Sequence, residues 1–438
     1  MRNKNVTARK FRIAAVGAVA LVLVLGMLTG ALFFLRPKTS TVEKRNLTEF
    51  PKMSVKGVLG GAYFKDISTW YADTFPGRDG LIAVNNHFKN LYGFETSEKL
   101  VTKVKEEADE IPVEKDLDTD VPELPKDVDP PKASAVDAAV QDAITNGLYI
   151  KDGVAYNIFY FYQEGVDRYA SILNKTAEML KGKTEVYSVL APTNVILLDE
   201  DTQKKLGGSD QTQTLQYYAS KYSDDVHMVY VADIFKKHKD EYLYFNTDHH
   251  WTADGAYYAY EMFCREKGIE PHERDYFKKQ ADYEPFLGSF YLELKDESLE
   301  KNPDTMHVYV PNGTNESTTM AQNGETFDNQ VIKDDNFDEN NKYIAFLGGD
   351  QRLTTIVNDA VEDDSSCVLV CDSYGNPFAP FLVDHYHTVY VKDFRYTDLN
   401  IAGFCIENNV TDLIVLNAMK ISSADSTLDQ LQVDLLGQ

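Results

Sequence analysis

Residues 368–377 of this 438-residue chain read VLVCDSYGNP and describe a passage from strand to helix. The apolar run at the start is typical of a buried parallel strand, Gly375 favours a turn, and Pro377 suits the first turn of a helix. In open α/β sheets, active sites form at the carboxyl ends of strands. The pattern therefore predicts that the Ser373 hydroxyl is presented at such an end. Backbone N–H groups of the turn, including those of Tyr374 and Gly375, could face a developing oxyanion there.

The chain around this stretch, from about residue 141 onward, alternates apolar β-rich runs with helical periodicity. The runs expected to be strands are Val186–Leu190, Val226–Val231, Tyr343–Leu347, Cys367–Cys371, Thr388–Val391 and Leu413–Leu416. Helical spacing is expected from Val166 to Lys181, from Ala256 to Cys264 and from Asn376 to Tyr386. This alternation predicts an α/β fold in which an open, mostly parallel sheet is covered by helices on both faces.

The composition is that of a globular chain with an acidic surface. Hydrophobic residues make up 43% of the sequence, and 44 basic against 69 acidic residues give a formal net charge of −25. Such a charge argues against nucleic acid as a partner. The four cysteines are no disulfide framework in a chain of this length, and we expect buried thiols. Cys367 and Cys371 are too far apart in one strand to bridge, whereas a pair that involves Cys264 or Cys405 stays open.

An apolar segment without a charged residue occupies residues 13–35. At about 1.5 Å per residue it spans roughly 34 Å, enough for a transmembrane helix. Residues 1–12 are basic and contain no acid, whereas the far flank mixes both signs, so the positive-inside rule leaves the N-terminus in the cytoplasm. We expect a single-pass cell-membrane protein with its main domain extracytoplasmic. A cleaved signal peptide is the alternative, but this run exceeds the usual ~7–15 apolar residues.

Composition divides the rest of the chain into three parts. Residues 36–100 interleave aromatic and charged side chains and are expected to be an ordered segment that packs on the main domain. Residues 101–140 are rich in Asp, Glu and Pro and contain no aromatic residue. This composition predicts a linker or disordered insertion, because it buries too little surface to offset its ordering entropy. Residues 141–438 are expected to form the main α/β domain.

A second reactive stretch, residues 247–252, reads TDHHWT. A serine nucleophile needs a base to take its proton, and a histidine base needs a third group to fix its tautomer. Asp248 and His250 offer this pairing, because two residues apart in an extended or turning segment they project to the same side. His250 would then face Ser373. His249 would point the other way and be structural.

Simpler interpretations stand beside each of these assignments. Ser373 could serve the turn alone, His250 could be a hydrogen-bonded structural histidine, and Trp251 a core aromatic. Residues 248–250 could instead be metal ligands, as in the phosphoesterases named for a DHH motif. Those enzymes need further aspartates in an Asp-x-Asp pattern ahead of the motif, and no convincing counterpart is present outside the acidic insertion. We therefore expect neither a metal nor another cofactor.

The stretch TDHHWT resembles the signature of the DHHW proteins of Gram-positive bacteria. These are relatives of the SGNH-hydrolase-like alginate O-acetyltransferases, whose corresponding motif is Asp-x-His-Trp. Similarity to family blocks, in family order, runs from about residue 40 to the C-terminus and leaves out the acidic insertion. The blocks are EKRNL (43–47), DTFPGRD (73–79), FLGSFY (286–291), FLGG (346–349), DSY (372–374), PFL (380–382) and DFRY (393–396).

The resemblance implies an SGNH-hydrolase-like three-layer sandwich with Ser373 as nucleophile, His250 as base and Asp248 as its orienting residue. Asp and His precede Ser here, as in the acetyltransferase relatives, and a triad is defined by geometry rather than by order. The family also suggests an oxyanion contribution from Gly349 and a ligand-facing role for Arg395.

Further positions bear on this site. Trp251 is a candidate for substrate contact. Arg395 could equally form an ion pair with Asp393 or Asp398. Asp350 stands where the family favours Asn, and because an ionised Asp cannot donate a hydrogen bond, this departure puts a third oxyanion donor in doubt.

Together these features predict a membrane-anchored extracytoplasmic O-acetyltransferase or esterase. It would act on a cell-envelope polysaccharide through an acyl-serine intermediate. By resemblance, a polytopic membrane O-acyltransferase would be a partner that delivers the acyl group. The alternative is a non-catalytic SGNH-like protein that binds envelope polymer or scaffolds a membrane complex, and Asp350 and the long insertion keep this alternative open.

Overall fold

The computed structural model describes residues 121–138, 140–279, 282–321, 324–335, 337–396 and 399–437, together with isolated positions between Arg36 and Pro76. The chain divides into two compact units, residues 1–102 and 103–438. The second unit contains most of the described residues, and these carry the candidate site.

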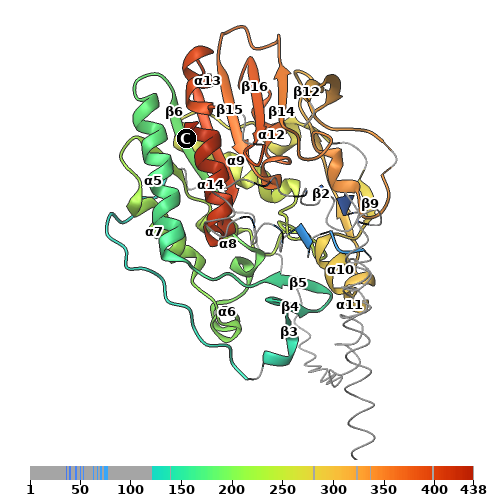
Figure 1. The fold of residues 1–438 in the computed structure, drawn as a ribbon. Helices are drawn as coiled ribbons and strands as arrows, with labels where there is room; N and C mark the ends of the chain where they lie inside the picture. The colour runs from blue at the N-terminus through green and yellow to red at the C-terminus, as the bar shows by residue number, and fades with distance from the viewer. Residues whose placement is uncertain are drawn as a thin grey trace, which may run out of the picture. The chain divides into compact units, whose positions relative to one another are not determined.

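The second unit is built around an eight-stranded sheet in the order β13-β12-β14-β16-β15-β17-β6-β7 (Figure 1). Neighbouring strands in one half are parallel: β16 (Thr388–Asp393), β15 (Ser366–Cys371), β17 (Asp412–Ala418), β6 (Glu185–Ala191) and β7 (Val226–Val229). The other half is antiparallel: β14 (Leu353–Val357), β12 (Glu316–Met320) and β13 (Thr326–Gln330). The fold is therefore mixed α/β with a large mixed sheet, and the predicted parallel strands form one half of it.

Five of the six predicted strands are confirmed as the parallel half of the sheet. The sixth, Tyr343–Leu347, is wrong, because its first residues form the 3-10 helix η5 (Lys342–Ala345). A turn follows in which Leu347, Gly348 and Gly349 have φ angles of 57°, 74° and 85°. Glycine adopts such angles without the steric cost of a Cβ, so the apolar run ends in a left-handed turn instead of a strand.

Helices cover both faces of the parallel strands (Figure 1). One layer contains α5 (Gln163–Leu180), α13 (Ile401–Glu407) and α14 (Asp425–Leu436), and the other contains α9 (Ala253–Lys267) and α12 (Ala379–Leu382). The predicted helices that correspond to α5 and α9 are confirmed. The third predicted helix, Asn376 to Tyr386, is reduced to α12. Further helices are η2 (Gln141–Ala143), η3 (Asn194–Leu197), α6 (Glu200–Leu206), α7 (Gln211–Lys221), α8 (Ala232–Lys237), η4 (Arg274–Tyr276), α10 (Ser289–Leu294), α11 (Glu297–Glu300) and η7 (Met419–Ser423).

Small antiparallel sheets complete the described part of the second unit. They are β3 (Ile144–Thr145), β4 (Leu148–Lys151) and β5 (Val154–Asn157); β9 (Tyr283–Phe286) with β10 (Asp304–Met306); and β8 (Lys278–Lys279) with β11 (Tyr309–Val310). Asp304 on β10 accepts hydrogen bonds from the backbone N–H groups of Asn246 (2.6 Å) and Thr247 (2.8 Å). It thereby fixes the start of the TDHHWT stretch.

The C-terminal part of the predicted acidic insertion, residues 121–138, belongs to the second unit and contains neither helix nor strand. Leu124 and Val128 pack against the core, and the backbone oxygen of Asp129 accepts a hydrogen bond from Gln213 on α7 (3.0 Å). This part of the segment therefore contacts the domain, whereas residues 101–120 lie outside the described residues.

The predicted transmembrane segment, residues 13–35, also lies outside the described residues. In the part of the chain that the structure describes, no helix combines the length and apolar character that a membrane crossing needs. The first unit contains the short pair β1 (Thr39–Ser40) and β2 (Arg45–Asn46). Its Arg36 lies over the ring of Trp70, 4.0 Å from the centroid, and donates a hydrogen bond to Thr74 Oγ1 (2.8 Å).

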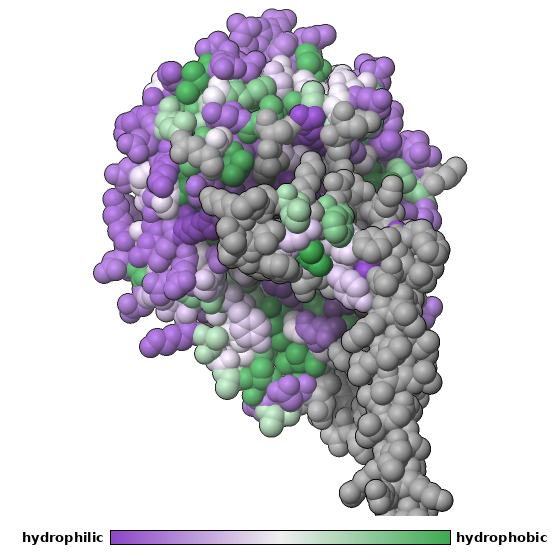
Figure 2. Space-filling view, in the orientation of Figure 1, coloured by the Kyte–Doolittle hydropathy of each residue, from purple (hydrophilic) through white to green (hydrophobic). Residues whose placement is uncertain are grey.

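The core of the second unit joins the parallel strands to both helix layers. All four cysteines are buried and free, which confirms the expected buried thiols. Hydrophilic residues cover most of the face of the second unit seen in Figure 2. That surface agrees with the 26% of charged residues in the sequence.

Candidate active site

Ser373 lies where the sequence places it, at the carboxyl end of β15 in the 3-10 helix η6 (Ser373–Gly375). The turn is tight because its third residue packs back on the strand. A Cβ at Gly375 would lie 2.3 Å from Cys371 Sγ, so only glycine fits. The strand therefore passes directly into a turn that exposes part of Ser373.

The Asp372 carboxylate anchors this turn to the next strand of the sheet. Its Oδ1 accepts a hydrogen bond from the N–H of Tyr374 (3.0 Å), and its Oδ2 accepts one from the N–H of Ala418 at the end of β17 (2.8 Å). Burial raises the pKa of Asp372 to about 6, although these hydrogen bonds and Arg395 act in the opposite direction. The serine turn, residues 372–376, is thus fixed by two neighbouring strands.

His250 connects Ser373 to Asp248 through two short hydrogen bonds. Its Nε2 lies 2.6 Å from Ser373 Oγ, and its Nδ1 lies 2.6 Å from Asp248 Oδ1. The backbone N–H of His250 also donates to Asp248 Oδ1 (3.0 Å), which closes a turn typical of aspartate. The side chains of His250 and Asp248 are only 8% and 7% exposed. The structure therefore brings together the three residues proposed from the sequence.

The Asp248 carboxylate is held in its charged form. Burial alone would raise its pKa, but the charges of His250 and His249 and the hydrogen bonds from His250 and Ser289 outweigh burial and lower the pKa. A fixed negative charge at Nδ1 of His250 stabilises the imidazolium that forms when Nε2 takes a proton.

Gly288 and Ser289 hold Asp248 from its other side. The N–H of Ser289, at the start of α10, donates to Asp248 Oδ2 (2.7 Å). A Cβ at Gly288 would lie 2.2 Å from Asp248 Cβ, so the carboxylate occupies the space of a side chain. Sequence reasoning assigned no role to this pair, because nothing local connects it to a residue about 40 positions earlier.

The orientation of the His249 side chain differs from the prediction. It was expected to point away from His250, yet the centroids of the two rings lie 3.8 Å apart. The reason is that residues 246–250 bend continuously instead of running as an extended strand. His249 Nδ1 lies 2.7 Å from Ser289 Oγ, and burial together with His250 lowers the pKa of His249 to about 4.

Three aromatic residues join the two reactive stretches. Tyr343 on η5 stacks on His250 at 4.0 Å between ring centroids and donates its hydroxyl to the backbone oxygen of Ser373 (2.9 Å). Trp251 is fully buried and donates its Nε1–H to the backbone oxygen of Tyr374 (3.0 Å), while the Tyr374 hydroxyl donates to the backbone oxygen of His249 (2.5 Å). Trp251 therefore packs against the serine turn and presents no surface for substrate contact.

This combination of residues coincides with a known family pattern. The model of the family described as DHHW protein matches residues 43–124 and 117–392. The chain belongs to the DHHW family. The recognition made from the TDHHWT stretch is thereby confirmed.

Several solved structures are similar to this chain. A DHHW family protein from Eubacterium siraeum DSM 15702 is similar at 27% identity over 67% of this chain and 98% of that chain, with a TM-score of 0.60. PatB1 of Bacillus cereus has a similar fold at 19% identity, over 64% of this chain and 98% of its own, with a TM-score of 0.55. The O-acetyltransferase domain of Pseudomonas putida AlgJ is more distant, at 10% identity over 65% and 98% of the two chains and a TM-score of 0.40. A comparison with curated proteins gave no match.

Three predicted oxyanion donors of this DHHW protein already have acceptors within the chain. The N–H of Gly349 donates to the backbone oxygen of Phe346 (2.9 Å), and that of Gly375 donates to the backbone oxygen of Asp372 (2.9 Å). The N–H of Tyr374 donates to the Asp372 carboxylate. These groups stabilise the turns, so an oxyanion would need other donors.

Asn376 offers such a donor and was not singled out from the sequence. Its side chain is buried, and its Nδ2 donates one hydrogen bond to Asp350 Oδ1 (2.9 Å), which leaves a second N–H. The backbone N–H of Ser373 opens η6, and the first N–H groups of a helix have no acceptor within it. The signal that could have found Asn376 is its spacing of three residues from Ser373 in a helical turn, which places both on one side.

Arg395 lies between two carboxylates. Its Nε donates to Asp393 Oδ1 (2.8 Å), and one terminal nitrogen donates to both Asp393 Oδ2 (2.6 Å) and Asp350 Oδ2 (2.6 Å). Burial would raise the pKa of Asp350, but Arg395 and Asn376 outweigh it and lower the pKa. The ion pair with Asp393 considered for Arg395 is present, and Asp398 lies outside the described residues.

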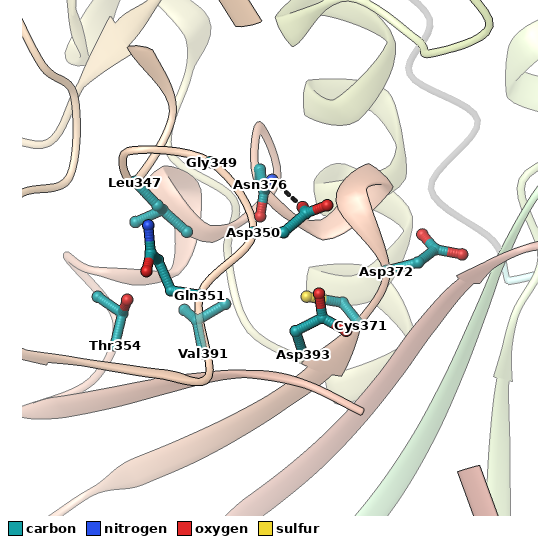
Figure 3. A pocket seen from close by; sticks show the side chains of 10 residues that line it. All are labelled: Leu347, Gly349, Asp350, Gln351, Thr354, Cys371, Asp372, Asn376, Val391 and Asp393. Atoms are coloured by element: carbon teal, nitrogen blue, oxygen red, sulfur yellow. Dashed lines mark hydrogen bonds between the residues drawn. The ribbon is translucent and has the colours of Figure 1, made fainter. Parts of the chain in front are cut away.

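A small cavity lies beside these groups, with room for about one water molecule (Figure 3). Figure 3 shows the hydrogen bond between Asp350 and Asn376 at this cavity. Its lining consists of Leu347, Gly349, Asp350, Gln351, Thr354, Cys371, Asp372, Asn376, Val391 and Asp393. The cavity is too small for a sugar, so a polymer would have to bind at the surface next to Ser373.

The metal alternative concerns residues 248–250. In the described part of the chain, Asp248, His249 and His250 form the single group of three potential ligands, with ligand atoms within 4.8 Å of one another. Asp248 and both ring nitrogens of His250 already take part in the hydrogen bonds to each other and to Ser373. A metal ion held by all three residues would therefore compete with the contact between His250 and Ser373.

Proposed function

We propose that this DHHW protein is a serine-dependent O-acetyltransferase or esterase with an SGNH-hydrolase-like three-layer domain. Its substrate is a cell-envelope polysaccharide, and its intermediate is an acyl-serine at Ser373. The observation that carries the proposal is the continuous hydrogen-bond chain from Asp248 through His250 to Ser373, with both contacts at 2.6 Å. Such a chain is what a hydroxyl needs to act as a nucleophile near neutral pH.

The first chemical step is attack of Ser373 Oγ on the carbonyl carbon of an acyl ester. The proton of the hydroxyl moves to Nε2 of His250, and Asp248 stabilises the resulting imidazolium. When the tetrahedral intermediate collapses, the same Nε2 gives the proton to the departing alcohol. The second step repeats this chemistry with a sugar hydroxyl in a transferase or with water in an esterase, and Ser373 is released.

The oxyanion of these steps is stabilised by the backbone N–H of Ser373 and the remaining N–H of Asn376. Both donors belong to the turn that carries the nucleophile, and donors that are fixed before the reaction stabilise developing charge most strongly. Asp350 supports this role because it orients the Asn376 amide through a hydrogen bond of 2.9 Å.

The proposed location is the outer face of the cell membrane, with residues 13–35 as a single anchor and residues 1–12 in the cytoplasm. The hydrophobicity of residues 13–35 and the basic residues before them support this topology. A polytopic membrane O-acyltransferase is the proposed source of acyl groups. An anchored acyl-serine enzyme would receive them at the membrane surface.

A non-catalytic role as an envelope-polymer binder or scaffold is the second candidate. The observation that favours it is the internal pairing of the N–H groups of Gly349, Tyr374 and Gly375. In that case the hydrogen bonds of Ser373 and His250 would be structural only.

A covalent probe separates the two candidates. One solved structure of PatB1 from Bacillus cereus carries a sulfonyl adduct, which makes a sulfonyl fluoride a suitable reagent. We expect the full-length chain in detergent to gain one sulfonyl group by intact mass and to hydrolyse 4-nitrophenyl acetate. Ser373→Ala should lose the adduct and at least about a thousandfold of the esterase rate.

His250→Gln should retain Ser373 but react at least about a hundredfold more slowly. Ser220→Ala on α7 is the matched control, because Ser220 donates to the backbone oxygen of Tyr217 and is remote in the fold from β15. Unchanged labelling and hydrolysis in Ser373→Ala would refute the enzymatic proposal and favour the scaffold.

A further inference from the structure

Asp350 carries an exposed negative charge beside the serine turn. Its side chain is 33% exposed, and its position is fixed by the left-handed turn from Leu347 to Gly349 that precedes it. A hydrogen bond of 2.9 Å attaches it to Asn376, which belongs to the turn that carries Ser373. A substrate held at Ser373 would therefore meet the Asp350 carboxylate.

Arg395 does not reverse the sign of this charge. Its guanidinium binds Asp393 through two nitrogens and Asp350 through one, so one cation is shared by two carboxylates. Asp372 adds another carboxylate at the base of the serine turn. Lys420 on η7 donates its ammonium to the neutral Asn157 Oδ1 (2.7 Å) and keeps its positive charge. Lys420 and Arg395 thus supply two positive charges against the four carboxylates of Asp248, Asp350, Asp372 and Asp393. The local charge next to Ser373 is thus negative, like that of the whole chain.

Asp350 also retains hydrogen-bonding capacity. A carboxylate has about four lone-pair positions. The described contacts of Asp350 use one at Oδ1, toward Asn376, and one at Oδ2, toward Arg395. The remaining positions can accept hydrogen bonds from a sugar hydroxyl or an ammonium group. They cannot accept one from a carboxylate or a phosphodiester group, because these groups have no donor at neutral pH.

We infer that Asp350 determines specificity by binding a hydroxyl or ammonium group of the sugar chain at Ser373 and by excluding anionic polymers. The substrate class is therefore a polysaccharide that is neutral or carries amines, and not one built from uronic acids or phosphodiesters. This inference rests on the proposed function, because it concerns the sugar held at the acyl-serine site. It adds a role for the aspartate at the position where the family resemblance favours asparagine.

Paired ligands that differ in one group test the inference. Cellotetraose acetylated at secondary hydroxyls and its counterpart with each C6 oxidised to a carboxylate have the same backbone, and they differ only at C6, where a carboxylate replaces a hydroxymethyl group. At pH 7 and low salt, we expect the full-length chain to hydrolyse the neutral ester with a kcat/KM at least about tenfold higher than that for the oxidised ester. High salt should narrow this ratio, since screening weakens repulsion between exposed charges.

Asp350→Asn keeps the size of the side chain and removes its charge. In this variant we expect the preference for the neutral ester over the oxidised ester to fall to about twofold or less. The preference is a ratio measured within one variant, so a change in rate that acts through the Asn376 amide, which Asp350 orients, affects both esters alike. Asp359→Asn is the matched control. Asp359 is 97% exposed and follows β14 at the opposite edge of the sheet, so the same change in net charge should leave the ratio unaltered.

Binding to the Ser373→Ala chain, measured by NMR line broadening of the acetyl signals, separates this inference from the catalytic proposal. Preferential binding of the neutral tetrasaccharide that is lost in Ser373→Ala/Asp350→Asn supports the inference, even if no chain hydrolyses an ester. Equal or tighter binding of the oxidised tetrasaccharide, binding of neither, or a preference that persists without Asp350 would overturn it.

Discussion

The two halves of the central sheet are stabilised in different ways. The parallel half buries aliphatic side chains on both faces, as in β15, where every residue from Cys367 to Cys371 is at most 2% exposed. The antiparallel half instead buries polar side chains that bond to one another. Asn329 on β13 donates to Thr319 on β12 (3.0 Å) and to the backbone oxygen of Leu347 (2.8 Å), and Thr319 lies 3.1 Å from Thr354 on β14.

The two halves therefore contribute differently: the parallel half stabilises the fold, and the antiparallel half positions residues beside the candidate site. Burial of apolar area is non-directional, so the parallel half provides a rigid base from which the serine turn emerges. Hydrogen bonds are directional, and those of Asn329 end on Leu347, at the turn that precedes Asp350. The parallel half thus holds Ser373, the proposed nucleophile, and the antiparallel half positions the Asp350 carboxylate beside it. Arg395, after β16, connects the two halves through its ion pair with Asp350.

Leu369→Ala, in the parallel half, should have the largest effect on stability. Leu369 is fully buried at the centre of β15, and truncation of such a leucine costs about 3 kcal/mol because a cavity remains. Urea unfolding followed by circular dichroism measures the loss. Phe327→Ala on β13 is the contrast: this ring is 43% exposed, and we expect a cost below about 1 kcal/mol. Equal losses in the two variants would contradict the proposed difference between the halves.

Asn329→Ala, in the antiparallel half, should destabilise the fold less than Leu369→Ala does, but it should also alter the candidate site. The change removes two hydrogen bonds and leaves the oxygen of Leu347 without this donor, a loss of about 1–2 kcal/mol in unfolding free energy. Because the turn before Asp350 loses its support, the preference for neutral over anionic tetrasaccharide should also weaken. Thr318→Ala, at an exposed position on β12, serves as the control in both measurements. A stability loss without any change in preference would limit the role of Asn329 to packing.

The smallest of the three expected effects on the free energy of unfolding is that of His249, and it appears as a dependence on pH. Its pKa is about 4 in the folded chain because of burial and His250, against about 6.5 for an unfolded histidine. Between these values only the unfolded chain binds the proton, so this residue makes the fold less stable as the pH falls from about 6.5 toward 4. The side chain is 36% exposed, and allowing for screening we expect about 1 kcal/mol between pH 7 and pH 5.

His249→Gln should remove this component, as measured by urea unfolding at both pH values. The comparison of the variant with its parent is needed because Asp372, with a pKa of about 6, acts in the opposite direction within the same range. His387→Gln, at the opposite edge of the sheet, controls for the loss of a histidine. An equal reduction of the pH dependence of the unfolding free energy in both variants would show that the effect does not come from the contact between His249 and His250.

The sequence predicted the parallel half well and the antiparallel half poorly, for the physical reason just described. Runs such as Cys367–Cys371 are continuously apolar, which is the mark of a strand buried on both faces. Strand β12 reads ESTTM, and its buried positions are Ser317 and Thr319, so no apolar pattern reveals it. Tyr343–Leu347 was misread because its apolar residues serve a helical turn and the contact with His250.

The candidate site shows the same limit. The sequence could predict Asp248, His250 and Ser373 because two short motifs contain these reactive residue types. The contacts of Ser289 with Asp248 and of Asp350 with Arg395 join segments about 40 residues apart, and such pairings depend on the path of the chain. Occupied N–H groups, such as that of Gly349, are likewise visible only in three dimensions.

The order of strands in the sheet has a consequence for the synthesis of the protein. β17 is the last strand along the chain, yet it lies between β15 and β6, and its end supplies the N–H of Ala418 to Asp372. A nascent chain that has reached Ser373 already contains all three reactive side chains but not the strand that joins the two parts of the sheet. Its serine turn can be completed only after the C-terminal segment has been made and inserted. Incomplete chains therefore lack the contact that holds Asp372 to the neighbouring strand.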